Sequence, residues 1–228
     1  MPIVDVIIPA FNEEKSIKSV IMDIPNGIVR HILVCNNGST DHTKAVAISA
    51  GAIVVDQPQK GYGNACLKGM EYIAAQEIKP DIVVFLDGDY SDYPQEMPSL
   101  IQPIVENDMD LVIGSRVKGE LESGSMQPQQ IFGNWLATSL IKLFYKYEFS
   151  DLGPFRAIKY QSLMTINMED RDFGWTVEMQ VKAAKLKMNC VEVPVNYKRR
   201  IGVSKVSGTL KGTILAGHKI LWTIFKLL

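Results

Sequence analysis

The sequence predicts an α/β fold with a mostly parallel, mixed sheet flanked by helices. Short apolar runs rich in β-branched residues alternate with stretches of helical periodicity, the pattern of parallel strands joined by crossover helices. Polar loops follow the first four of these runs. The 228 residues suit one large domain, or one domain with a small appendage, and 46% apolar with 21% charged residues is typical of a folded core.

Five strands are expected in the first half of the chain, with helices between them. The strands are predicted at residues 3–8, 32–35, 53–55, 82–86 and 111–113. The helices are predicted at residues 13–24, 62–75 and 94–105, and a further helix is capped by the segment 39–41. In the second half, residues 119–130 predict a long loop of the kind that often acts as a lid. Helices follow at residues 132–147 and 208–228, with a strand at 191–197.

The polar loops are expected to meet at one edge, because ligands of open α/β sheets bind outside the carboxyl ends of the strands. The loop after the fourth strand contains Asp87, Gly88 and Asp89. Alternation turns both carboxylates to one side, and Gly88 permits close approach. Paired carboxylates suit Mg²⁺ or Mn²⁺, which can bridge the phosphates of a nucleoside diphosphate. The alternative is a polar turn that caps a helix.

Two other loops carry features typical of phosphate or nucleoside contacts. Lys60 and Gly61 precede a helix, and a helix N-terminus with a lysine attracts phosphate. The segment 36–41 either contacts base and ribose or forms a turn before a capped helix. The glycines at 61–63 lack the third glycine and the acidic partner of a dinucleotide fingerprint, which disfavours a dehydrogenase.

Two arginines are placed to hold anionic oxygens. Arg116 ends the fifth strand, and Arg156 lies in a later turn. A guanidinium binds phosphate through two parallel hydrogen bonds, but either arginine could instead form a structural ion pair.

Composition excludes some partners and favours others. A net charge of −1 lacks the basic footprint of a nucleic-acid binder. The last thirty or so residues nevertheless carry lysines and arginines and no acid, which predicts an anionic partner there, either phosphates or a membrane surface. Three scattered cysteines fit neither a disulfide framework nor a zinc site, which favours reduced thiols in a cytoplasmic protein.

Residues 208–228 are predicted to form a C-terminal amphipathic helix beside a main domain of residues 1–207. Lys211, Lys219 and Lys226 fall on one face of this helix. The helix could pack on the core, lie at the cytoplasmic face of a membrane, or form a homodimer contact. No run reaches about 18 apolar residues, so no membrane span is expected. The start lacks the features of a signal peptide.

Nine short motifs follow one another in a recognisable order. They are PAFNEE, NGSTD, KGYGNA, DGD and GSR in the first half, and DLGPFRA, EMQVKA, VEVPV and RRIGVSK in the second. The first five resemble the family 2 inverting glycosyltransferases. The last four resemble the dolichyl-phosphate mannose and glucose synthase group. The resemblance spans residues 4–205 and implies a GT-A fold that transfers a sugar from a nucleotide diphosphate with inversion.

The resemblance also implies roles for single residues. Nucleoside contacts fall on Pro9, Phe11, Glu14 and Asn37, the last at a position that is often Asp in the family. Asp87 and Asp89 would hold the metal, while Ser91 replaces a Gln that is commonly the third contact. The residues expected to bind phosphate oxygens of the donor or the acceptor are Arg116, Arg156, Arg199 and Lys205. Arg200 is an alternative to Arg199 in this role. Catalysis is assigned to Asp89, Arg116 and Arg156.

We therefore expect metal-dependent transfer of a hexose from a GDP- or UDP-linked donor to a polyprenyl phosphate. A lipid phosphate needs cationic positioning and no general base, because its oxygens are already ionised. The main rival is transfer to a saccharide hydroxyl in polysaccharide or glycoconjugate synthesis, which requires a base such as Asp151, Asp172 or Glu178. A sugar nucleotidyltransferase is disfavoured by the first loop, and a non-catalytic nucleotide-sugar binder is disfavoured by the intact pair of aspartates.

Overall fold

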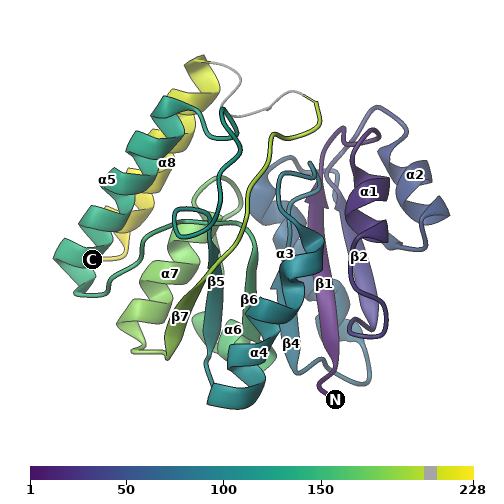
Figure 1. Cartoon of the computed structure of the whole chain (residues 1–228), viewed down its shortest axis with the longest axis horizontal. Helices are drawn as coiled ribbons and strands as arrows, with labels where there is room; N and C mark the ends of the chain where they lie inside the picture. Colours follow the sequence, from purple (N-terminus) through teal and green to yellow (C-terminus); the bar gives the residue numbers. More distant parts are fainter. Residues whose placement is uncertain (203–209) are drawn as a thin grey trace.

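A computed structural model describes residues 1–202 and 210–228 (Figure 1). Seven strands of the described residues form one sheet in the order β3-β2-β1-β4-β6-β5-β7. The strands are β1 (Val4–Ala10), β2 (His31–Asn36), β3 (Ile53–Asp56), β4 (Ile82–Phe85), β5 (Leu111–Ser115), β6 (Arg156–Lys159) and β7 (Cys190–Pro194). The helices are α1 (Ile17–Met22), α2 (Thr43–Ser49), α3 (Tyr62–Ala75), the short 3-10 helix η1 (Pro94–Glu96), α4 (Met97–Asn107), α5 (Pro128–Tyr145), α6 (Tyr160–Ile166), α7 (Trp175–Lys185) and α8 (Leu210–Lys226).

The sheet is parallel except at one strand. β1 pairs in parallel with β2 and β4, β2 with β3, and β5 with β7. β6 runs antiparallel between β4 and β5, with Ala157 opposite both Val84 and Val112. The mostly parallel, mixed sheet flanked by helices is confirmed. Because β6 is reversed, the carboxyl ends of β1, β4 and β5 lie at the same edge.

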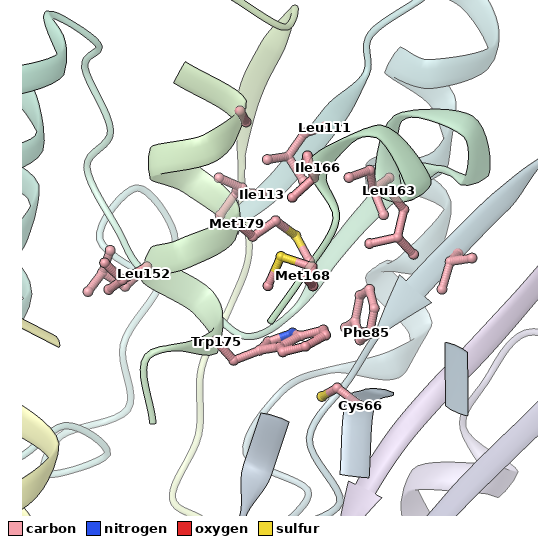
Figure 2. Close-up of a cluster of buried hydrophobic side chains, with 14 of the residues drawn as sticks. Cys66, Phe85, Leu111, Ile113, Leu152, Leu163, Ile166, Met168, Trp175 and Met179 are labelled. Atoms are coloured by element: carbon pink, nitrogen blue, oxygen red, sulfur yellow. The ribbon is translucent and has the colours of Figure 1, made fainter. Parts of the chain in front are cut away.

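Successive residues of each strand point to opposite faces of the sheet, and a hydrophobic layer packs on each face. Val6 and Ile8 pack on the side covered by α1, α2 and α4. Ile7 packs on the opposite side, which α3 and α5–α8 cover. In that second layer the rings of Phe85 and Trp175 meet edge to face, with centroids 5.8 Å apart (Figure 2). A large aromatic pair of this kind fixes α7 against the sheet beside the carboxyl end of β4.

The predicted elements of the first half are all present, and α3 has the predicted bounds. Three elements of the second half are absent from the prediction: β6, α6 and α7. β6 has only four residues and α6 only seven, so neither has enough length to show a clear period. α5 begins at Pro128, inside the predicted loop 119–130, and β7 ends at Pro194, before the predicted 197.

The helices α5 and α8 lie side by side at one end of the molecule, beside α7 (Figure 1). The boundary predicted between residues 207 and 208 lies outside the described residues. Among the described helices, none combines the length and the apolar character that crossing a bilayer requires. The three cysteines are free.

Candidate active site

The loops after β1, β2 and β4 are joined by hydrogen bonds at the carboxyl edge of the sheet. The Ser16 hydroxyl donates to the Gly88 carbonyl at 2.8 Å, and the Glu13 N–H donates to the Thr43 hydroxyl at 2.8 Å. The Asn37 N–H donates to the Ala10 carbonyl at 2.8 Å. Loops that are distant in sequence are therefore joined into one rim, as expected for loops at the carboxyl ends of the strands.

A first cavity of about 430 Å³ opens inside this rim. It is lined by Pro9, Ala10, Phe11, Glu13, Asn37, Lys60, Gly61, Tyr62, Ala65, Asp87, Gly88, Asp89, Asp172, Phe173 and Arg200. Most of the predicted donor-contacting residues are thus brought together. Glu14 is an exception, because its carboxylate accepts the His42 N–H outside the cavity wall, and its neighbour Glu13 lines the cavity instead.

Asn37 lines the first cavity, but its side-chain amide forms hydrogen bonds with the protein backbone. Its Nδ2 donates to the carbonyls of Gln57 and Gln59, the latter at 2.7 Å. Its Oδ1 accepts the Gly61 N–H at 2.8 Å. An aspartate could not donate to the two carbonyls, so the amide explains why Asn stands at this position.

Lys60 and Gly61 lie at the start of α3, where a loop from the second half of the chain closes over them. The Lys60 ammonium lies 4.9 Å from the ring centroid of Phe11. A Cβ on Gly61 would meet the Arg171 carbonyl oxygen at 2.1 Å, so glycine is required for this approach. The same loop brings Asp172 and Phe173 to the cavity wall.

Asp87 and Asp89 face the cavity in different environments. Asp87 is half-buried by surface area, and its Oδ1 accepts the Tyr62 hydroxyl at 2.9 Å. Burial, together with the charge of Asp89, raises the pKa of Asp87 above its ordinary value. Asp89 Oδ1 accepts the Ser91 N–H at 2.9 Å, and its Oδ2 lies 3.1 Å from Arg200 Nη1.

Two neighbouring carboxylates that repel each other fit a hard divalent cation, which would relieve the repulsion. In the described part of the chain, no group of three His, Cys, Asp or Glu side chains could hold a metal ion by itself. The pair therefore suits an ion of the Mg²⁺ kind, which keeps several waters and binds one or two carboxylates plus substrate phosphates.

A second cavity of about 320 Å³ adjoins the first. The two share the side chains of Tyr62, Asp87, Asp89, Phe173 and Arg200. The rest of the second wall comes largely from α5 and α8 and from residues around the end of β5. These include Arg116, Gln129, Gln130, Asn134, Tyr197, Ala216, Gly217 and Ile220. The paired carboxylates thus lie where two cavities meet.

Arg116 reaches the second cavity while paired with a buried acid. Its Nε lies 2.8 Å from Asp151 Oδ2 and its Nη2 lies 2.7 Å from Asp151 Oδ1. Burial acts to lower the pKa of Arg116, but Asp151 outweighs it and raises the pKa above its ordinary value. The guanidinium also lies 5.0 Å from the ring centroid of Tyr197. Arg116 is therefore a fixed positive charge in the wall of the cavity.

Arg156 lies apart from both cavities. It is fully buried, and its guanidinium donates to the carbonyls of Leu152, Gly153 and Thr176. Burial lowers the pKa of Arg156 to about 10. Because its donors are already engaged beneath the site, this arrangement does not favour the predicted phosphate contact, which stays a prediction.

The two adjacent arginines point to different places. Arg199 is 64% exposed, and its Nε donates to the Ser123 carbonyl on the outer loop at 2.8 Å. Arg200 lines both cavities and pairs with Glu13 and Asp89. The geometry therefore favours the rival assignment, Arg200, over Arg199. Lys205 lies outside the described residues.

Only one of the three candidate bases faces a cavity. Asp151 is taken by Arg116, and the Glu178 carboxylate accepts the Asp170 N–H at 2.7 Å and pairs with Lys182. Asp172 lines the first cavity, where burial followed by the charge of Asp170 raises its pKa.

The sheet, the paired carboxylates and the nucleotide-sized cavity define a transferase of the GT-A class that uses a nucleotide sugar. Residues 5–167 match glycosyl transferase family 2, and the chain belongs to this family. An uncharacterized glycosyltransferase of Mycobacterium tuberculosis is 34% identical over 216 residues, which cover 93% of this chain and 94% of the relative. A UDP-N-acetylglucosamine–dolichyl-phosphate N-acetylglucosaminyltransferase of Methanococcus voltae is 27% identical, with 97% and 94% covered.

The fold is also found in solved structures. Glucosyl-3-phosphoglycerate synthase from Mycobacterium tuberculosis, in complex with Mn²⁺, uridine diphosphate and phosphoglyceric acid, superposes with a TM-score of 0.78. The match covers 99% of this chain and 78% of that protein at 23% sequence identity, which establishes the shared GT-A fold.

Proposed function

We propose that this protein transfers a hexose, with inversion, from a GDP- or UDP-linked donor to a polyprenyl or dolichyl-type phosphate. The observation that carries the proposal is the pair of cavities that meet at Asp87 and Asp89, with Arg116 and Arg200 in the wall of the second. Resemblance to the dolichyl-phosphate mannose and glucose synthases supports it. So does the Methanococcus voltae relative, whose name specifies a dolichyl-phosphate acceptor.

The first cavity would hold the donor. Phe11 and Pro9 offer apolar surface to the nucleoside, and Lys60 offers a positive charge to the diphosphate. Asp87 and Asp89 would hold Mg²⁺ or Mn²⁺, which neutralises the charge that develops on the leaving nucleoside diphosphate. The protein's part is to fix the two carboxylates at the junction of the cavities, through Tyr62 and Ser91.

The second cavity would hold the acceptor phosphate. Arg116 is a fixed cation that can position its oxygens, while Arg200 borders both cavities and is also within reach of the donor. A phosphate needs no base because it is already ionised. Donor and acceptor would then approach the junction from separate cavities. Attack from the side opposite the leaving group is the geometry that inverts the anomeric centre.

The outer surface of α5 and α8 would lie on an anionic membrane. Large apolar side chains are exposed on both helices: Ile131, Phe132, Trp135, Leu143 and Phe144 on α5, and Ile214, Leu215, Trp222 and Phe225 on α8. The sequence of α8 carries three lysines and no acid. These same helices wall the second cavity, so a lipid phosphate held in the membrane surface would lie next to it. This supports a peripheral position at the cytoplasmic face.

One observation favours a second candidate, transfer to a saccharide hydroxyl. Asp172 faces the first cavity and has a raised pKa, as a general base would. The variant Asp172→Asn separates the two. This variant should lower the rate of transfer to a hydroxyl by a factor of about 10²–10⁴. The rate of transfer to a phosphate should be unchanged.

The decisive experiment offers UDP- and GDP-linked hexoses with Mn²⁺, with and without a short-chain polyprenyl phosphate in detergent. A lipid-linked sugar that is lost on chelation is the expected product. Transfer only to an oligosaccharide, or donor binding without any lipid product, would contradict the proposal.

A further inference from the structure

The Arg200 side chain bridges two carboxylates from different loops at the junction of the cavities. Its Nη2 lies 2.9 Å from Glu13 Oε1, and its Nη1 lies 3.1 Å from Asp89 Oδ2. Both carboxylate side chains are about 10% exposed and Arg200 is 26% exposed. Solvent and salt screen partly buried ion pairs much less than surface pairs. The attraction between Arg200 and the two carboxylates is therefore stronger than in an exposed ion pair.

Both oxygens of Asp89 are engaged in this arrangement. Oδ1 accepts the N–H and the hydroxyl of Ser91, and Oδ2 faces the Arg200 guanidinium. A divalent cation at Asp89 must therefore share Oδ2 with a guanidinium or displace it. Two positive groups at one carboxylate repel each other.

Backbone hydrogen bonds on either side of Arg200 keep this residue close to the site, whether or not its side chain contacts Asp89. The Ile201 N–H donates to the Asp89 carbonyl at 2.9 Å, and the Lys198 N–H donates to the Ser91 carbonyl at 2.9 Å. The guanidinium can thus change partners by side-chain rotation alone. Its Nε is buried without a hydrogen-bond partner, which leaves one donor for an anionic ligand.

From these contacts we propose that Arg200 is an internal counterion that competes with the divalent cation for Asp89. The cation then binds strongly only when a donor diphosphate draws the guanidinium onto its own oxygens. This inference rests on the proposed nucleotide-sugar donor and metal. Its consequence is reciprocal coupling, in which nucleotide raises metal affinity and metal raises nucleotide affinity by the same factor.

The test is direct Mn²⁺ binding, measured by the electron paramagnetic resonance signal of the free ion, with and without UDP or GDP. For the wild type, nucleotide should raise Mn²⁺ affinity by about 5- to 50-fold. In Arg200→Gln, Mn²⁺ alone should bind at least about 5-fold more tightly than it binds the wild type. The nucleotide should raise Mn²⁺ affinity by a smaller factor than in the wild type, because only the direct contact between phosphate and cation remains. The Mn²⁺-induced rise in melting temperature should also be larger in this variant.

Two further variants sharpen the result. Arg199→Gln removes the adjacent arginine, which faces the outer loop, and should leave Mn²⁺ affinity unchanged. Arg200→Lys keeps the charge but cannot span both carboxylates, so it should give an intermediate affinity and serves if the glutamine variant is unstable.

Mn²⁺ affinity that is unchanged or weaker in a folded Arg200→Gln or Arg200→Lys would overturn the inference while leaving the proposed function in place. Absence of Mn²⁺ binding to the wild type with either nucleotide would overturn both the inference and the metal assignment.

Discussion

The Arg116 guanidinium binds the Asp151 carboxylate through two hydrogen bonds, 2.8 and 2.7 Å long, one to each carboxylate oxygen. The backbone N–H of Arg116 donates to the same carboxylate at 2.8 Å. Asp151 is fully buried, and its own N–H donates to Glu192 at 3.1 Å. The end of β5 is thereby fastened to the loop before β6, and the positive charge of Arg116 has a fixed position in the second cavity.

Removing one partner of this pair should be costly. Asp151→Ala leaves a buried, unpaired guanidinium, so the free energy of unfolding should fall by about 3–5 kcal/mol. Urea denaturation measures the loss. The double variant Arg116→Met/Asp151→Leu removes both charges and should be clearly more stable than Asp151→Ala. A loss below about 1 kcal/mol in the single variant would mean that the pair behaves as a surface pair.

Asp89→Ala should abolish turnover while leaving the fold intact. Asp89 is at the surface of both cavities, and its loss removes one of the two carboxylates proposed for the metal. We expect transfer with Mn²⁺ to fall by at least about 10²-fold, with an unchanged far-ultraviolet circular dichroism spectrum. Asp108→Asn, an exposed carboxylate paired with Lys159, is the matched control and should keep its activity. Near wild-type turnover in Asp89→Ala would rule out the metal assignment.

The residues that sequence patterns located well are those set by local chain geometry. Asp87 and Asp89 follow a buried strand, so their position at the carboxyl edge follows from the strand itself. The start of α3 follows from Gly61, which cannot continue a helix at φ 134°.

Long-range packing decides the residues that sequence patterns misplace or leave open. Arg199 and Arg200 are adjacent in a segment outside the strands, yet their side chains contact different parts of the protein, Ser123 on the outer loop and Asp89 at the cavities. Nothing local distinguishes them; the hydrogen bonds of Lys198 and Ile201 to the Ser91 and Asp89 carbonyls set the register. Arg156 follows a turn that contains Gly153 and Pro154, which predicts an exposed guanidinium, but the pairing of β6 between two strands buries this side chain.

Gly174→Ala should loosen α8 and the wall of the first cavity together. A Cβ at Gly174 would meet Thr223 Oγ1 of α8 at 2.4 Å and Asp170 Oδ2 at 2.5 Å. Asp170 also pairs with Lys219 of α8 at 2.9 Å, in the loop that carries Asp172. The free energy of unfolding should fall by about 1–3 kcal/mol, and the KM for donor should rise.

Gly133→Ala is the control for stability in this experiment. Its Cβ would meet nothing within 4 Å on α5. Because alanine is the better helix former, this variant should gain up to about 1 kcal/mol. Equal stability changes in the two variants would contradict the tight contact assigned to Gly174.

Tryptophan fluorescence should report whether the α5–α8 surface meets a membrane. Of the three tryptophans, Trp175 is 1% exposed, whereas Trp135 on α5 and Trp222 on α8 are 60% and 56% exposed. Anionic lipid vesicles should shift the emission to shorter wavelength, because the two exposed indoles leave water. Neutral vesicles should shift it less, since the lysines of α8 lose their counter-charge. Trp135→Ser/Trp222→Ser should retain only the constant emission of Trp175 and should sediment less with vesicles. If vesicles leave the wild-type emission spectrum unchanged, this surface does not bind the membrane. A lipid phosphate would then have to reach the second cavity by another route.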